Sequence, residues 1–211
     1  MDPLIDDYIL CNLSPEDPVL EWLERETNIR TTHGRMLSGP VLGRLLTTFS
    51  RMVRPARVLE IGTFTGYSAI CLARGLDGEG HLDAIEKNDL HKELIYEAFE
   101  RAGVKDRITL HLGDAADVLV KLAGNTYDLV YIDGNKREYC KYYELLFDMV
   151  RRGGYILADN VLWYGKVVMN PLPGDAQTRE IYRFNKMVKE DLRTESFILP
   201  LRDGVTIIRK L

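Results

Sequence analysis

Cysteine is scarce in this chain of 211 residues, and the three cysteines that occur, Cys11, Cys71 and Cys140, follow no metal-binding or redox spacing. An odd and unpatterned set argues against a disulfide-built scaffold and indicates a reducing compartment. Long apolar runs are absent too, so the sequence predicts no membrane-spanning helix. The first ten residues, MDPLIDDYIL, lack the basic region and the apolar core of a signal peptide. We therefore expect a cytoplasmic protein.

Neither sign of charge dominates the composition. The chain has 28 lysines and arginines against 32 aspartates and glutamates, a formal net charge of −4, which disfavours a broad nucleic-acid-binding surface. Internal repeats and low-complexity segments are absent as well. Hydrophobic residues make up 45% of the chain, enough to bury one sizeable core. We expect a single domain over residues 1–211, with an N-terminal helical extension (1–54) and a Rossmann-like core (55–211).

Short apolar runs alternate with helical patterns after residue 55. We expect strands at 58–61, 82–86, 108–112, 127–132 and 155–158, and one of the helices between them should span 139–150. Two further strands, 195–199 and 205–209, follow without a helix between them. This order predicts an α/β, doubly wound fold: a mostly parallel seven-stranded sheet with an antiparallel edge hairpin and N-terminal helices. Ligands of such folds bind at the carboxyl ends of the strands.

The stretch VLEIGTFTGYS (58–68) combines the first strand with a glycine turn and the start of a helix. Free backbone N–H groups at such a turn attract an anionic group. Phe64 occupies the second glycine position of the dinucleotide fingerprint G-x-G-x-x-G, which disfavours NAD. Glu60 would repel a pyrophosphate but could receive an ammonium group. The stretch therefore favours S-adenosylmethionine, which carries both an amine and a carboxylate.

Two acidic residues follow the next strands. Glu86 ends the second strand, 24 positions after Gly62, where a carboxylate can accept hydrogen bonds from ribose hydroxyls. A helix N-terminal carboxylate or a turn-forming residue is the alternative for Glu86. Asp114, in Gly-Asp-Ala, could accept a hydrogen bond from an adenine amine or cap the following helix, and both interpretations stay open.

Oxygen-bearing side chains end the fourth and fifth strands, which we expect to be neighbours in the sheet. Asp133, Asp159 and Asn160 offer two carboxylates and one carboxamide. Such a set suits a hard divalent cation, Mg²⁺ first, with Ca²⁺ or Mn²⁺ as alternatives. Ordinary turns and a helix cap are equally compatible with the spacing.

Lys136 lies three residues after Asp133. A lysine that is partly desolvated beside a divalent cation can serve as a general base, whereas the alternative is a solvated surface lysine. The aromatic pair Trp163-Tyr164 could wall a pocket or simply pack. The four histidines show no ligand spacing.

Four ordered motifs carry a resemblance to a known family: VLEIGTFTGYS, GDA at 113–115, YIDGNKREY at 131–139 and LADNVLWYGKV at 157–167. The chain, from about Met36 to its end, resembles the cation-dependent class I O-methyltransferases, which include the catechol and caffeoyl-CoA enzymes and bacterial relatives. The resemblance implies metal-dependent methyl transfer from S-adenosylmethionine to a hydroxyl of a catechol-like or other small acceptor. A hydroxyuridine in tRNA is the alternative acceptor. The resemblance also implies a homodimer.

The same resemblance implies a role for each matched residue. The cofactor-binding residues would be Ser38, Glu60, Gly62, Thr63, Ser68, Glu86, Asp114, Ala115, Asp133 and Asn135. The metal ligands would be Asp133, Asp159 and Asn160, with Lys136 as the catalytic base. A non-catalytic cofactor-binding module could share the fold, but the intact metal and base set argues against it. Two residues depart from the family pattern. Gly134 stands where Ala or His is common, and Arg44 stands where Gln is common.

Overall fold

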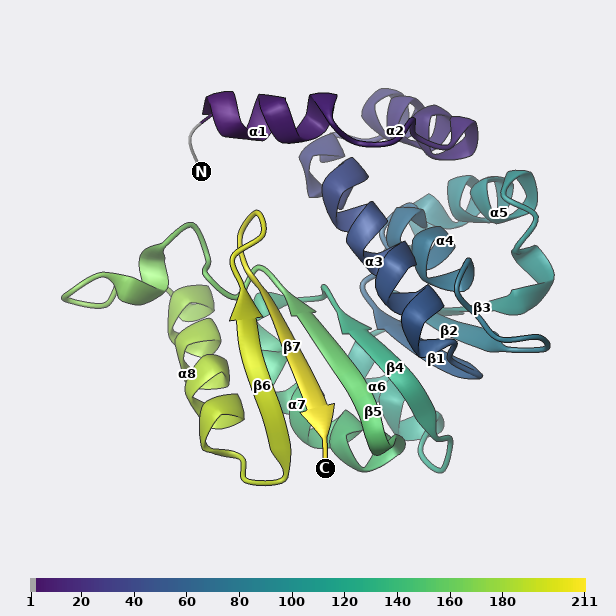
Figure 1. Ribbon diagram of the computed structural model, residues 1–211. Coiled ribbons are helices and arrows are strands. Elements are labelled where there is room, and N and C mark those ends of the chain that lie inside the picture. Colours follow the sequence, from purple (N-terminus) through teal and green to yellow (C-terminus); the bar gives the residue numbers. More distant parts are fainter. Residues whose placement is uncertain (1–2) are drawn as a thin grey trace.

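The computed structural model describes residues 3–211. Its centre is a seven-stranded sheet in the order β3-β2-β1-β4-β5-β7-β6, shown in Figure 1. Strands β1 to β5 pair in parallel, and β7 runs antiparallel to both β5 and β6. The predicted fold is therefore confirmed. The strands are β1 (Arg57–Ile61), β2 (His81–Glu86), β3 (Ile108–Leu112), β4 (Tyr127–Ile132), β5 (Val150–Asp159), β6 (Thr194–Leu199) and β7 (Val205–Lys210).

Helices flank both faces of the sheet. None of those in residues 3–211 combines the length and the apolar character needed to cross a lipid bilayer. They are α1 (Pro3–Cys11), α2 (Pro18–Arg30), α3 (Gly39–Val53), α4 (Tyr67–Ala73), α5 (Lys92–Arg101), α6 (Ala115–Lys121), α7 (Tyr139–Leu146) and α8 (Ala176–Glu190).

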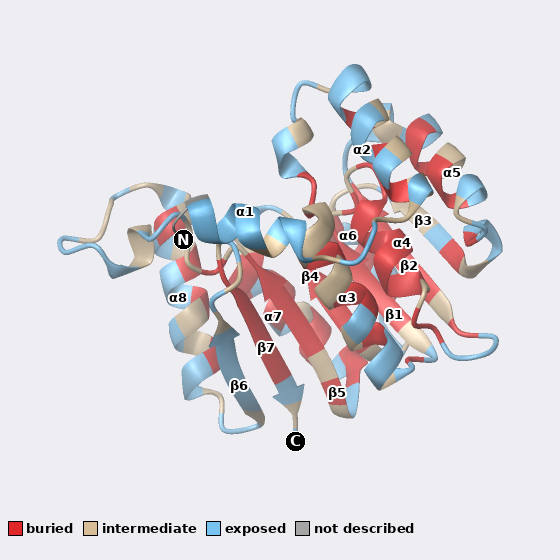
Figure 2. Cartoon of the chain, turned by 45° about the horizontal axis from the view of Figure 1, so that its top comes forward, coloured by how far each residue is buried: buried red, intermediate tan, exposed pale blue. Residues whose placement is uncertain are grey.

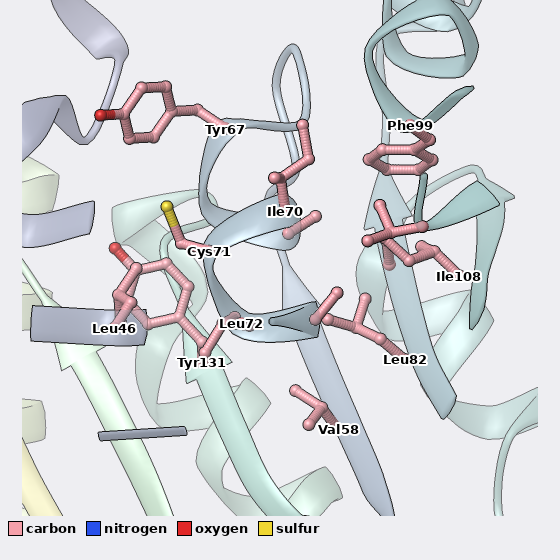
Figure 3. Close-up of a cluster of buried hydrophobic side chains, with 14 of the residues drawn as sticks. Leu46, Val58, Tyr67, Ile70, Cys71, Leu72, Leu82, Phe99, Ile108 and Tyr131 are labelled. Carbon is pink, nitrogen blue, oxygen red and sulfur yellow. The ribbon is translucent and has the colours of Figure 1, made fainter. Parts of the chain in front are cut away.

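Two hydrophobic cores form because successive strand residues point to opposite faces of the sheet. Val58 joins the core under α2, α3, α4 and α5, whereas Leu59 joins the core under α6, α7 and α8. Figure 3 shows part of the first core, where Ile70 and Leu72 of α4 lie close to Val58 and Leu82 of the sheet. Figure 2 shows the central strands buried, and the edge strand β6 largely exposed.

The segment between α1 and α2 is fastened to the rest of the molecule. The Asp17 carboxylate caps α2 by accepting a hydrogen bond from the Val19 N–H at 2.7 Å, a role that aspartate commonly takes at the start of a helix. The Tyr67 hydroxyl of α4 donates to the Glu16 carboxylate at 2.8 Å. Arg44 donates to the carbonyl oxygen of Pro15 at 3.0 Å, so this departure from the family pattern anchors the N-terminal helices.

Two element bounds differ from the prediction by more than one residue. The helix that begins at Tyr139 ends at Leu146 instead of residue 150, and β5 begins at Val150 instead of residue 155. Val150 already pairs with Tyr127 of β4, and the register then shifts. Gly153, at φ +73°, provides the left-handed residue that such an irregularity requires. Apolar spacing alone does not reveal where this backbone pairing begins.

Candidate active site

A cavity of about 620 Å³ lies where β1, β2, β4 and β5 end. The strand order reverses between β1 and β4, which is the place where ligands bind in doubly wound sheets. The predicted site residues that line the cavity are Gly62, Glu86, Asp114, Ala115, Asp133, Asn135, Lys136, Asp159 and Asn160. The four others do not line it and are buried: Ser38, Glu60, Thr63 and Ser68. A more open hollow of similar size, between α7 and α8, contains none of the predicted residues.

The glycine turn after β1 lies directly against the end of β4. Gly62 has φ +93°, and a Cβ at this position would stand 2.3 Å from the Asp133 carbonyl oxygen. The Asp133 N–H donates to the Ile61 carbonyl at 2.8 Å. Only glycine permits both the left-handed backbone and this close approach. The turn and the Asp133 loop are therefore held together as one unit.

Glu60 lies beneath this turn with no exposed surface. Its Oε2 accepts a hydrogen bond from the Thr63 hydroxyl at 2.8 Å, while Oε1 is buried without a hydrogen-bond partner among the described residues. Burial raises the pKa of this carboxyl to about 8, an effect that the hydroxyls of Ser68 and Thr63 oppose. A hydrogen-bond donor that reached Oε1 would offset the desolvation of the charged form.

Glu86 is almost fully buried and held at both oxygens. Oε2 accepts from the Phe64 N–H at 2.7 Å, and Oε1 accepts from the Asn88 N–H at 2.7 Å. Phe64 has φ +51°, a left-handed conformation that is uncommon for residues other than glycine. A carboxylate has about four acceptor positions, so this turn-stabilising role leaves acceptor capacity for ribose hydroxyls at the cavity wall.

Asp114 has one of the two roles expected for it, that of a helix cap. Its side chain caps α6 by accepting from the Ala116 N–H at 3.1 Å, and it pairs with the Lys87 ammonium at 2.9 Å. Because Asp114 also lines the cavity, a contact with an adenine amine stays a prediction.

Asp133 and Asp159 face the same cavity from neighbouring strands. The Asp159 carboxylate accepts from the Asn160 N–H at 2.8 Å and from the Tyr131 hydroxyl at 3.3 Å. Burial raises the pKa of Asp159 to about 7, and the negative charge of Asp133 adds to the increase. The helix-cap interpretation of Asp159-Asn160 is wrong, because the next regular element is a 3-10 turn at Lys166–Val168.

The donor set at this edge consists of hard oxygen atoms. In residues 3–211 there is no group of three or more histidine, cysteine, aspartate or glutamate side chains that could hold a metal ion. The predicted ligand set is not such a group, because it consists of two carboxylates and one carboxamide, that of Asn160. A divalent cation would relieve the repulsion between the carboxylates of Asp133 and Asp159, so the residues fit such an ion.

Lys136 is not a solvated surface lysine. Its side chain is only 11% exposed, and its Nζ donates to Asp133 Oδ1 at 2.6 Å and to the Tyr139 hydroxyl oxygen at 2.8 Å. The Tyr139 hydroxyl in turn donates to the Asp159 carbonyl oxygen at 2.9 Å. Sequence reasoning missed Tyr139, although its spacing of three residues from Lys136 within the motif YIDGNKREY was a usable signal.

Aromatic and basic side chains also line the cavity. Trp163 and Tyr164 both line it, with φ angles of +48° and +56°. The pocket-wall interpretation of this pair is therefore confirmed. Sequence reasoning missed the other lining residues here because they come from distant segments: His33, Arg35, Met36, Arg202 and Asp203.

Known proteins resemble this chain over nearly all its length. The family model described as O-methyltransferase matches residues 12–211. Caffeoyl-CoA O-methyltransferase 1 of Arabidopsis thaliana is 33% identical, over 97% of this chain and 83% of the relative. Caffeoyl-CoA O-methyltransferase of Populus kitakamiensis is 34% identical, over 80% of this chain and 76% of the relative.

Solved structures agree with the sequence comparisons. The O-methyltransferase of Bacillus cereus, in complex with SAH, has a TM-score of 0.89 at 27% identity and covers 99% of this chain and 97% of its own. The O-methyltransferase TomG of Streptomyces achromogenes, in complex with SAM, has a TM-score of 0.90 at 28% identity. The match covers 98% of this chain and 95% of TomG. These comparisons confirm the family predicted from the four motifs. The chain belongs to the O-methyltransferase family.

Proposed function

We propose that this protein transfers a methyl group from S-adenosylmethionine to a hydroxyl of a catechol-like or other small acceptor, and that the transfer depends on a divalent cation. One observation carries the proposal. The Lys136 ammonium lies 2.6 Å from Asp133 Oδ1 within the cavity that Asp159 and Asn160 also line. A candidate base and candidate metal ligands thus meet beside the glycine turn of an O-methyltransferase.

The cofactor half of the cavity suits S-adenosylmethionine in shape and in charge. Because Gly62 has no side chain, the turn can lie directly against Asp133. Glu86 presents a fixed carboxylate for ribose hydroxyls. Glu60 provides the buried acidic group on the side of the turn where the amine of the methionine part would lie. The SAH and SAM complexes of the two solved relatives support the same cofactor here.

Asp133, Asp159 and Asn160 would hold the cation, and Lys136 would act on the acceptor. When bound, S-adenosylmethionine supplies a methyl group on a sulfonium centre and the cation lowers the pKa of the acceptor hydroxyl. In its uncharged form, Lys136 Nζ accepts the proton of that hydroxyl. Tyr139 keeps Nζ oriented through its 2.8 Å contact. Trp163 and Tyr164 would contact a planar acceptor on one side and help to orient it.

Three of the arginines that could bind tRNA phosphates give little support to tRNA as the acceptor. Arg54 pairs with Asp77 at 2.6 Å, and Arg57 pairs with Asp83 at 2.7 Å. Arg151 pairs with Asp128. Phosphate binding depends on basic groups that are free to replace counterions, and these arginines already have carboxylate partners.

A methyl-transfer assay tests the proposal directly. Catechol, a caffeoyl thioester and undermodified tRNA are each incubated with S-adenosylmethionine, with and without Mg²⁺. We expect methylation of at least one of the two small phenols, and only with the cation. Methylation of tRNA alone, or transfer that survives exhaustive chelation, would contradict the proposal. The homodimer and the cytoplasmic location rest on the resemblance and the composition, and light scattering tests the former.

A further inference from the structure

The turn between β6 and β7, residues 201–204, lies at the same edge of the sheet as the active-site loops. Val205, the first residue of β7, pairs antiparallel with Asp159, the last residue of β5. The turn therefore lies next to the end of β5, where the candidate metal ligand Asp159 is found. Figure 1 shows this yellow hairpin turn projecting beyond the ends of its two strands.

One side of the turn fixes the aromatic wall of the cavity. The Asp203 carboxylate accepts from the Tyr164 N–H at 2.6 Å, and the Asp203 carbonyl oxygen accepts from the Leu162 N–H at 2.9 Å. Gly204 has φ +81°, and a Cβ there would stand 2.5 Å from Leu162 Cγ. Trp163 and Tyr164 are held in left-handed conformations that cost energy for residues other than glycine. These bonds to the turn help to keep them there.

The other side of the turn reaches a distant segment of the chain. The Arg202 guanidinium donates to the carbonyl oxygens of Ser38 and Leu37, the latter at 3.3 Å. Arg202 lies 164 positions after Ser38 and 165 positions after Leu37 in the sequence. Leu37 and Ser38 are buried, whereas Arg35 and Met36, just before them in the sequence, line the cavity. Arg202 itself lines the cavity.

We propose that Arg202 is a positioning residue that holds the 35–38 segment against the Trp163-Tyr164 wall, and so sets the width of the acceptor side of the cavity. The inference rests on the proposed function only in assigning the acceptor to this side. A guanidinium presents several N–H donors in a fixed fork and can hold two carbonyl oxygens at once. Loss of this clasp would separate the two walls and remove no hydrogen bond from Lys136, Asp133 or the glycine turn. The positive charge of Arg202 also opposes the rise that burial causes in the pKa of Asp159, and Arg202→Lys keeps that charge.

Tryptophan fluorescence tests the clasp without any acceptor. The chain has two tryptophans, and a Trp22→Phe background leaves Trp163 as the only one. We expect Arg202→Gln to raise acrylamide quenching of Trp163 about twofold, and Arg202→Lys, which keeps the charge but not the fork, to give an intermediate value. Arg209→Gln is the matched control, because Arg209 is exposed on the same hairpin and pairs with Glu195 at 3.2 Å. Unchanged quenching in Arg202→Gln, or an equal rise in Arg209→Gln, would overturn the proposal.

Kinetics with catechol supply the second readout. We expect Arg202→Gln to raise the KM for catechol about tenfold, the scale of one charge-assisted hydrogen bond, with kcat within about threefold of the wild type. A fall in kcat at constant KM would contradict a positioning role. If the wild-type protein methylates neither catechol nor the caffeoyl thioester, the proposed acceptor class is wrong, and the quenching comparison still decides the role of Arg202.

Discussion

Lys136 Nζ and Asp133 Oδ1 form an ion pair of 2.6 Å inside the cavity. The candidate base and a candidate metal ligand therefore share one carboxylate. A cation bound at Asp133 would compete with the lysine for that negative charge. The pairing thus links the metal site to the position of the candidate base.

Two substitutions at Lys136 separate proton transfer from charge pairing. Lys136→Ala should reduce turnover by about 10²–10⁴-fold, the usual contribution of a general base, while cofactor affinity changes little. Lys136→Arg can retain the ion pair with Asp133 but stays protonated, so we expect a similar loss. Steady-state rates and calorimetric titration measure the two effects. Raised pH should recover part of the Lys136→Ala rate. Wild-type turnover in Lys136→Arg would show that the residue acts through its charge alone.

Chelation tests the oxygen ligands. Exhaustive EDTA treatment should abolish methyl transfer, and added Mg²⁺ should restore it. Asp159→Ala should abolish transfer while leaving S-adenosylmethionine affinity nearly intact, because most of the predicted cofactor contacts lie on or after β1, β2 and β3, away from β5. Asp117→Asn, an exposed carboxylate on α6, serves as the control and should keep full activity. A fully active Asp159→Ala variant would remove this residue from the metal site.

The close approach of Gly62 to Asp133 predicts a larger loss of stability than backbone strain alone. Gly62→Ala would combine φ +93° with a Cβ 2.3 Å from the Asp133 carbonyl oxygen. Gly124→Ala is the matched control, since Gly124 has φ +99° and no heavy atom within 4 Å of its built Cβ. We expect Gly124→Ala to lose about 1–2 kcal/mol, the cost of a left-handed residue, and Gly62→Ala to lose clearly more. Urea unfolding measures both losses. Equal unfolding midpoints for Gly62→Ala and Gly124→Ala would contradict the steric argument.

The sequence predicted the residues that lie at strand ends, because their positions follow from the order of strands and helices. Gly62, Glu86, Asp133 and Asp159 all fall on the cavity for this reason. Arg202 could not be found in this way. Its partners, Leu37 and Ser38, lie 165 and 164 positions away, and they present only backbone carbonyl oxygens. A contact with a backbone carbonyl leaves no side-chain pattern in a sequence. Which sections of the chain meet at an edge hairpin depends on the tertiary packing.

Glu60 predicts a specific dependence of stability on pH. Burial raises the pKa of its carboxyl in the folded protein to about 8, from an ordinary value of 4.5. Between these pH values the folded state therefore binds more protons than the unfolded state, and the free energy of unfolding falls as the pH rises. The contribution of one such group approaches about 1.4 kcal/mol per pH unit.

Glu60→Gln removes this titration while keeping an amide of similar shape. Urea unfolding of both proteins at pH values from 5 to 9 measures the difference in their free energies of unfolding, in which the other titrating groups largely cancel. We expect the variant to gain stability relative to the wild type as the pH rises through this range, and the difference to level off above about pH 8, where the folded-state carboxyl is ionised. A difference that stays constant from pH 5 to 9 would show that Glu60 is already ionised in the folded protein at pH 5. In that case a buried cationic partner would have to be sought close to its carboxylate.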